Sequence, residues 1–199
     1  MNCDRCPALC KSRTRIALPT PCHAGGLLAI GEAPGADEDA AGEGFVGRAG
    51  KTLDGVLLAN GIGRDGYGRA NIVRCRPEGN RKPTPRERDA CLPLLIDFIL
   101  ECRPRVLLLV GQTPTGVFRG NGSLLGRIEE TRRWGGSIIG ENLCHPAVKK
   151  LTGRDFALAA VPMPHTSPLA WNRNAPDGRK WAEIGREQVA FAAGILRGS

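Results

Sequence analysis

The stretch LLAIGEAPGADEDAAGEGFVGRAG runs from Leu27 to Gly50 and combines two kinds of sequence. Its first four residues are apolar, which is typical of a strand buried on both faces, and a glycine-rich acidic loop follows. Similar apolar runs occur at 70–73, 106–110 and 157–161. Helical periodicity is found at 49–59, 85–102, 113–118 and 179–196. This alternation predicts an α/β fold, a three-layer α/β/α arrangement with a central four-stranded parallel sheet.

The predicted sheet also indicates where a ligand would bind. In open parallel sheets, ligands lie beyond the carboxyl ends of the strands. The residues to examine are therefore those that follow Ile30, Val73, Val110 and Val161. Glycine and arginine interrupt residues 119–155, where we expect a short hairpin or insertion.

The length and charge of the chain indicate how many domains it forms and what kind of partner it binds. The 199 residues suffice for one compact core, so we expect a single domain over residues 1–199. A formal net charge of +8 and a pI near 9.4 favour a polyanionic partner such as nucleic acid. The opening residues lack the pattern of a secretory leader, and the apolar runs are too short for a membrane span. We therefore expect a cytoplasmic monomer with no membrane partner.

Eight cysteines in such a chain point to metal binding or buried thiols rather than to a disulfide framework. Cys3 and Cys6 form a CxxC pair, and Cys75 and Cys91 flank a basic segment. Two such pairs could supply four thiolates to a [4Fe-4S] cluster or to a structural zinc. The spacing does not choose between these metals, and Cys10 is close enough to Cys6 to compete as a ligand.

The acidic loop does not have the sequence of a phosphate-binding loop. It lacks the Gly-Lys-Ser/Thr ending, and the carboxylates of Glu32, Asp37, Glu38 and Asp39 would repel a phosphate. Its glycines allow backbone N–H groups to approach a ligand closely. The loop therefore favours a neutral polar ligand together with an activated water.

Several of these segments together resemble the family 4 uracil-DNA glycosylases, the iron–sulfur branch of the uracil-DNA glycosylase superfamily. The resemblance rests on GEAPGADED, GFVGRAG, ANIVRCRPEGNRKPTPRERDAC and RPRVLLLVG, and it extends from Cys3 to about Gly111. It implies a repair enzyme that flips uracil out of DNA and hydrolyses its N-glycosidic bond, leaving an abasic site.

The resemblance also implies roles for particular residues. Glu32 would position or activate the water, and Asn71 would read the uracil edge. Phe45 would stack on the extruded base, while Glu38 holds the motif's second acidic position. The backbone of Gly31, Ala33 and Gly35 would hold a uracil carbonyl. Four cysteines match the ligands of a structural [4Fe-4S] cluster, namely Cys3, Cys6, Cys75 and Cys91.

The family's second motif, a histidine after the last strand, has two candidates. His145 begins HPAVKKL and has the more literal His-Pro, whereas His165 begins HTSPLAWNRN and follows the last apolar run. We choose His165 because it lies where the ligand-binding end of that strand should be. It would donate to the uracil O2, and Leu169 would act as the wedge that fills the gap in the stack, with Arg173 nearby. Thr166 replaces a proline here, which puts the rigidity of the loop in question.

The basic segment from Arg74 to Arg88 is expected to meet DNA phosphates, with Arg76, Arg81 and Lys82 as its contacts. Two alternative functions remain open. One is a superfamily member that holds uracil-DNA without turnover, but such proteins carry a histidine in this loop, and RPEGNRKPTP has none. The other is an iron–sulfur redox or DNA-binding module, in which Phe45, Asn71 and His165 need not meet.

Overall fold

The computed structural model describes residues 3–133, 135 and 145–198 and confirms the predicted fold class. Its centre is a parallel four-stranded sheet in the order β2-β1-β3-β4. The strands are β1 (Leu27–Gly31), β2 (Tyr67–Asn71), β3 (Val106–Val110) and β4 (Ala159–Met163). Because β1 and β3 are neighbours, Ile30 lies opposite Leu109, and the loops that follow these two strands emerge side by side.

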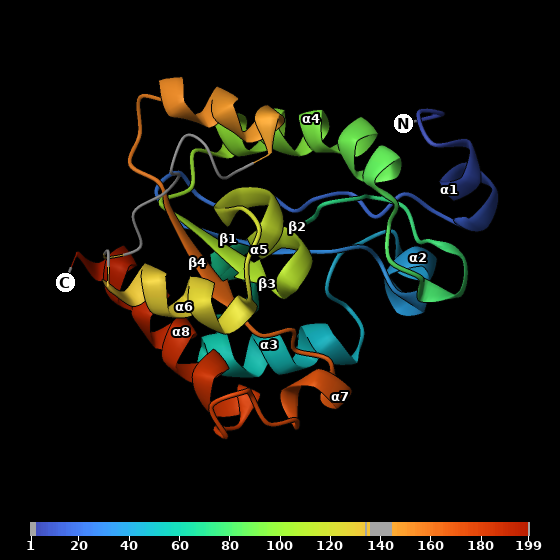
Figure 1. The fold of residues 1–199 in the computed structure, drawn as a ribbon. Coiled ribbons are helices and arrows are strands. Elements are labelled where there is room, and N and C mark those ends of the chain that lie inside the picture. Colours follow the sequence, from blue (N-terminus) through green and yellow to red (C-terminus); the bar gives the residue numbers. More distant parts are fainter. Residues whose placement is uncertain (1–2, 134, 136–144, 199) are drawn as a thin grey trace.

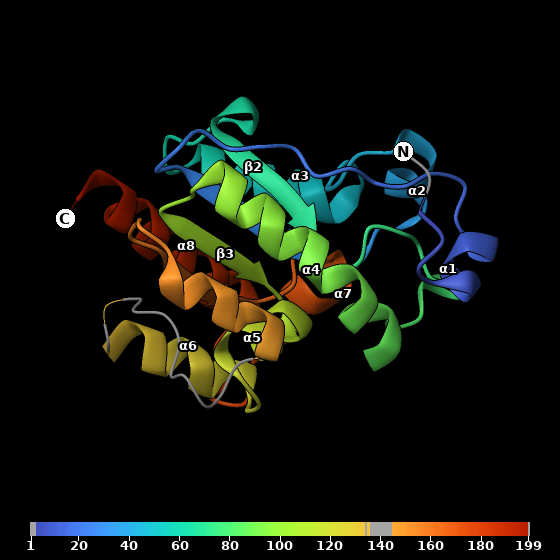
Figure 2. The ribbon, with the colours of Figure 1, turned by 90° about the horizontal axis from the view of Figure 1, so that it is seen from above.

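Helices cover both faces of the sheet (Figures 1 and 2). One face packs against α4 (Pro85–Cys102) and α5 (Gln112–Arg119), and the other packs against α3 (Arg48–Leu58) and α8 (Trp181–Arg197). The alternation along β1 explains this division, since Leu28 and Ile30 face the first group while Leu27 and Ala29 face the second. The core therefore has two halves, one on each side of the sheet.

Shorter helices complete the described part of the chain. They are α1 (Pro7–Ser12), α2 (Ala36–Ala41), α6 (Leu124–Arg133) and α7 (Pro168–Trp171), with 3₁₀ segments at Arg64–Gly66, Glu78–Asn80 and Pro146–Gly153. In both views α1 lies at the end of the molecule where α4 begins (Figures 1 and 2). Among the residues described, no helix has the length and apolar character needed to cross a membrane.

Three predictions about the elements need correction. β2 begins at Tyr67 rather than at residue 70, because Arg69 is buried in an ion pair with Glu43 and so does not interrupt the strand. β4 continues through Pro162 to Met163, which an edge strand tolerates because one side of it donates no hydrogen bonds. The expected hairpin at 119–155 is wrong for the described part of that segment, which is helical in α6 and in the 3₁₀ segment; residues 134 and 136–144 lie outside the description.

Candidate active site

A pocket opens at the carboxyl ends of the strands, where the sequence predicts a ligand site. It contains every residue predicted to act in catalysis or to bind the base. These are Gly31, Glu32, Ala33, Gly35, Glu38, Phe45, Asn71 and His165. Pro34, Ala49, Pro77, Asn80 and Arg81 complete the lining. Residues that follow three different strands thus converge on one cavity.

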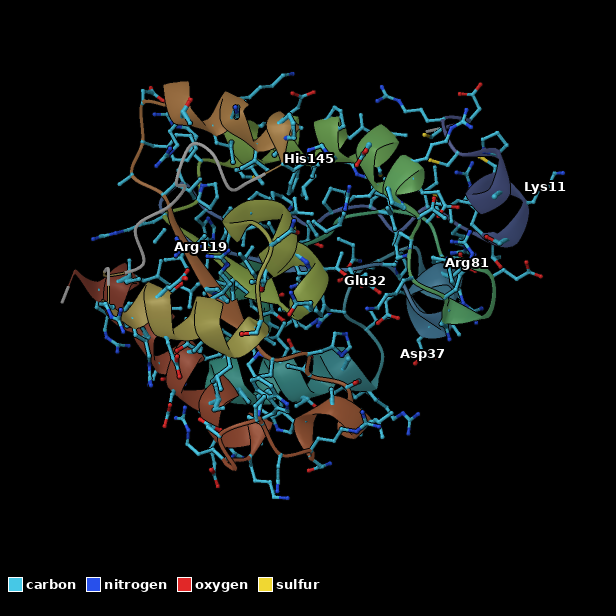
Figure 3. All side chains as sticks on the ribbon, in the orientation of Figure 1. Lys11, Glu32, Asp37, Arg81, Arg119 and His145 are labelled. Atoms are coloured by element: carbon cyan, nitrogen blue, oxygen red, sulfur yellow. The ribbon has the colours of Figure 1, made fainter. Side chains whose placement is uncertain are left out.

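Glu32 follows β1 directly and is half-buried in this pocket. The hydroxyl of Thr113 donates a hydrogen bond to Glu32 Oε2. Thr113 belongs to the first turn of α5, which follows β3, so the contact arises from the adjacency of β1 and β3. Figure 3 shows Glu32 near the middle of the molecule, with Arg81 and Asp37 further out toward α1 and α2. Sequence reasoning missed Thr113, although its place just after a strand end was a usable signal.

The other carboxylates of the acidic loop bind backbone N–H groups. Glu38 accepts from Gly35 N at 3.0 Å and from Gly47 N at 2.8 Å, so it caps α2 and closes the loop. Asp39 is only 2% exposed and accepts from the backbone of Thr14 at 2.9 Å. These contacts give both side chains a role in the shape of the loop.

Asn71 and Phe45 both line the pocket beside Gly31. Asn71 is the last residue of β2 and is 8% exposed, and Phe45 is 7% exposed and packs into the α3 side of the core. Both side chains lie against Gly31: a Cβ atom there would stand 2.4 Å from Asn71 Oδ1 and 2.9 Å from Phe45 Cζ. Glycine at position 31 is therefore what allows the amide and the ring to approach the same point.

His165 follows β4 and lines the pocket, with part of its ring open to solvent. Its Nδ1 accepts the N–H of Ser167 at 3.1 Å, so the neutral ring carries its proton on Nε2. Burial against the pocket walls lowers the pKa of His165 below its usual value, and the Glu32 carboxylate opposes this shift only in part. The histidine is therefore set up as a neutral Nε2–H donor.

The loop around His165 is anchored even though it lacks the expected proline. Thr166 is fully buried, and its hydroxyl donates to the carbonyl of Ala49 at 2.8 Å, which ties the loop to α3. His145, the other candidate, lies elsewhere: its Nε2 is 3.0 Å from Asp89 Oδ1, and its Nδ1 accepts from Ala147 N. Figure 3 shows His145 beside α4, well away from Glu32. Only His165 of these two histidines lines the pocket.

The four predicted cysteine ligands line a second, smaller cavity between α1 and α4. Burial and the nearby thiols of Cys91, Cys3 and Cys75 raise the pKa of Cys6 to about 11. Cys10 does not line this cavity, and its thiol donates to the carbonyl of Cys3 at 3.2 Å.

Arg13 supplies positive charge beside these thiols. Its Nη1 donates to Cys75 Sγ at 3.1 Å and its Nη2 to the carbonyl of Cys3 at 2.8 Å, so it links the two cysteine pairs. Within the described ranges, no group of three or more His, Cys, Asp or Glu side chains is arranged to hold a single metal ion. Four thiols and a cationic donor thus surround one cavity, a donor set of the kind that iron–sulfur clusters use.

Of the residues predicted to contact DNA, only Arg81 is among those that line this pocket. Arg81 reaches the pocket, but its guanidinium is paired with both oxygens of Glu87 at 2.7 and 2.9 Å. Arg76 Nε donates to Asn80 Oδ1 at 2.8 Å, and Lys82 is exposed. Leu169 is 69% exposed on α7. Arg173 is also exposed, just beyond that helix.

Comparison with known proteins agrees with this geometry. Residues 21–186 match the family model of the uracil DNA glycosylase superfamily, which is most of the chain. The protein is therefore a member of that superfamily.

Comparison with individual relatives shows to which family of the superfamily the chain belongs. It is 33% identical to the type-4 uracil-DNA glycosylase of Archaeoglobus fulgidus over 155 residues, covering 74% of this chain and 77% of the relative. It is 43% identical over 110 residues to that of Pyrobaculum aerophilum, and 38% identical over 117 residues to that of Thermotoga maritima. Those two matches cover 55% and 59% of this chain and 56% and 60% of the relatives. Within the superfamily, the chain belongs to the type-4 uracil-DNA glycosylases.

Proposed function

We propose that this protein removes uracil from DNA by hydrolysing the N-glycosidic bond, which releases the base and leaves an abasic site. The observation that carries the proposal is the convergence of Glu32, Asn71, Phe45 and His165 on one pocket at the carboxyl ends of the strands. A carboxylate, an amide, an aromatic ring and a neutral imidazole are the groups that recognition and release of uracil require.

Recognition falls to Asn71 and Phe45. A side-chain amide can accept from uracil N3–H and donate to O4, whereas cytosine presents an acceptor and a donor at those two positions. Because Asn71 is nearly buried, a mismatched pattern would leave polar groups without partners in the pocket. Phe45 offers a flat apolar wall on which an extruded base stacks. The pocket therefore selects uracil before the chemistry begins.

Bond cleavage falls to Glu32 and His165. The C1′–N1 bond breaks with its electron pair moving to the base, so positive charge develops on the sugar and negative charge on uracil. His165 donates from Nε2 to the uracil O2, and the Glu32 carboxylate stabilises the sugar cation and orients a water toward C1′. The water oxygen bonds to C1′, and its proton leaves through Glu32. No lysine nucleophile takes part, so the strand itself is not cleaved.

We also propose that the protein holds a structural [4Fe-4S] cluster, with four cysteine ligands: Cys3, Cys6, Cys75 and Cys91. When bound, the cluster cross-links the N-terminal segment to the loop after β2 and to α4. Support comes from the single cavity that these thiols line. The same cross-link would hold the Arg76–Lys82 segment in place for DNA phosphates.

We also propose that residues 1–199 act as one domain and as a monomer, since helices of the same chain cover both faces of the sheet. A cytoplasmic location fits the free thiols of Cys3 to Cys102.

The function is tested with a 5′-labelled oligonucleotide that carries one uracil, in single-stranded and duplex form, under single-turnover conditions. Alkali should cut the strand at the uracil after incubation with the protein, and matched oligonucleotides with cytosine or thymine at that position should stay intact. Glu32→Gln should abolish most of the cleavage. Tight binding of uracil-DNA by the wild-type protein without any alkali-labile product would contradict the proposal and would favour the capture protein.

A further inference from the structure

The loop that carries Phe45 has an uncommon backbone conformation. Phe45 has a φ of 59°, which lies in the left-handed region that aromatic residues rarely adopt. Its carbonyl accepts a hydrogen bond from Arg64 Nη1 at 2.9 Å, and it lies so close to Gly50 of α3 that a Cβ atom there would stand only 1.9 Å from it. We therefore expect the contacts of the Phe45 carbonyl with Arg64 and Gly50 to set the direction of the Phe45 ring.

Arg64 is itself held by two carboxylates. Its Nη1 pairs with Asp54 Oδ2 at 2.8 Å and its Nη2 with Glu43 Oε1 at 3.2 Å. Glu43 also accepts from Arg69 at 2.9 Å, and the Tyr67 hydroxyl donates to Asp54 at 2.6 Å. Two arginines and two carboxylates thus balance in charge and join α3, β2 and the acidic loop. The network fixes the guanidinium that faces the Phe45 carbonyl.

This network contacts the loop without taking part in the pocket lining. Neither Arg64 nor Asp54 lines the pocket, whereas Phe45 does. The direct route from Arg64 to a bound base is therefore through the position of Phe45. A purely structural anchor would instead lower stability and weaken all DNA ligands alike.

We propose that Arg64 is a positioning residue that holds the Phe45 ring as the stacking wall for the extruded uracil. This inference rests on the proposed function. Arg64 acts by pinning the Phe45 carbonyl, so the ring is already in place before the base arrives. The loop then loses its conformational entropy when the protein folds, so this loss does not weaken the binding of DNA.

The test compares two DNA ligands that are not cleaved. One duplex carries 2′-fluoro-2′-deoxyuridine, which presents a uracil base, and the other carries a tetrahydrofuran abasic analogue, which presents none. Phe45→Ala should weaken binding of the uracil analogue about tenfold, the scale of one lost base–aromatic stack, and should leave abasic DNA within about twofold. Arg64→Gln should do the same. The Arg64→Gln/Phe45→Ala double variant should bind no more weakly than Phe45→Ala.

Controls separate positioning from folding. Arg186→Gln removes an exposed arginine on α8 and should change neither affinity. Arg64→Lys keeps the charge and one donor, so it should recover part of the lost affinity for the uracil analogue, and it serves as the test variant if Arg64→Gln does not fold. Additive losses in the double variant, or an equal loss on abasic DNA, would overturn the inference. A wild-type protein that does not prefer the uracil analogue to a thymine control would instead show that the proposed function has failed.

Discussion

The hydroxyl of Thr113 offers a direct test of how the Glu32 carboxylate is oriented. Thr113→Val keeps the shape of the side chain and removes the donor to Glu32 Oε2. A hydrogen bond to a charged group contributes about 1.5–3 kcal/mol. If it acts fully in the transition state, its loss lowers the single-turnover rate of uracil release about 10- to 150-fold. The rate constant is measured with excess enzyme on a uracil oligonucleotide, so that product release does not enter.

Thr113→Ser is the matched control, because it retains the hydroxyl and loses only a methyl group. Its rate should stay within about threefold of the wild type, given how little one half-buried methyl contributes. Affinity for the uncleavable uracil analogue should change little in either variant, since Glu32 faces the sugar and the water in the proposed arrangement. A Thr113→Val variant that cleaves at the wild-type rate would refute the idea that this bond orients the carboxylate.

Three further predictions concern the two candidate histidines and the proposed cluster. Because the pKa of His165 is lowered below its usual value and Nε2 is its donor, the single-turnover rate should stay level from about pH 7 to 9, above the usual histidine pKa. A tenfold fall per pH unit across that range would show that the imidazolium is needed instead. His165→Ala should lose most activity while His145→Ala retains it, as a side-by-side comparison would show. Cys91→Ser should lose iron and visible absorption in the purified protein, whereas Cys10→Ser should keep both; equal iron loss in the two variants would place Cys10 among the ligands.

The sequence predicts most of the fold because its signals are local. The helix predicted at 85–102 from its periodicity matches α4 at both ends, and in the structure Thr84 and Glu87 form a capping box at its start. The strand-end rule selects His165 over His145 for the same reason, because it needs only the position of the last apolar run. Local signals fail where a long-range partner changes the outcome, as at Arg69, whose burial depends on Glu43.

The site residues that the sequence did not predict depend on how the elements are arranged in space, above all on the order of the strands. Four strands can be predicted from four apolar runs, but their order in the sheet cannot. Thr113 reaches Glu32 only because β3 lies beside β1. The pairing of Arg64 with the Phe45 carbonyl likewise joins residues from separate elements, and no periodicity in the chain encodes it. A sequence pattern can indicate candidate catalytic residues, but it does not indicate which residues from other elements position them.

The start of α3 connects the two sides of the proposed reaction. Gly50 has no side chain and so leaves room for the Phe45 carbonyl, and the Ala49 carbonyl accepts a hydrogen bond from the hydroxyl of Thr166, next to His165. The segments that carry Phe45 and His165 therefore both contact the first turn of α3, which in the proposed mechanism would fix the stacking ring relative to the donor to the leaving base. The acidic loop contributes to this rigidity, because Glu38 bonds the backbone just before α3, at Gly47. Glu38 thus bonds the backbone groups that shape the pocket, and in the proposed mechanism Glu32 is the carboxylate that acts on the sugar and the water.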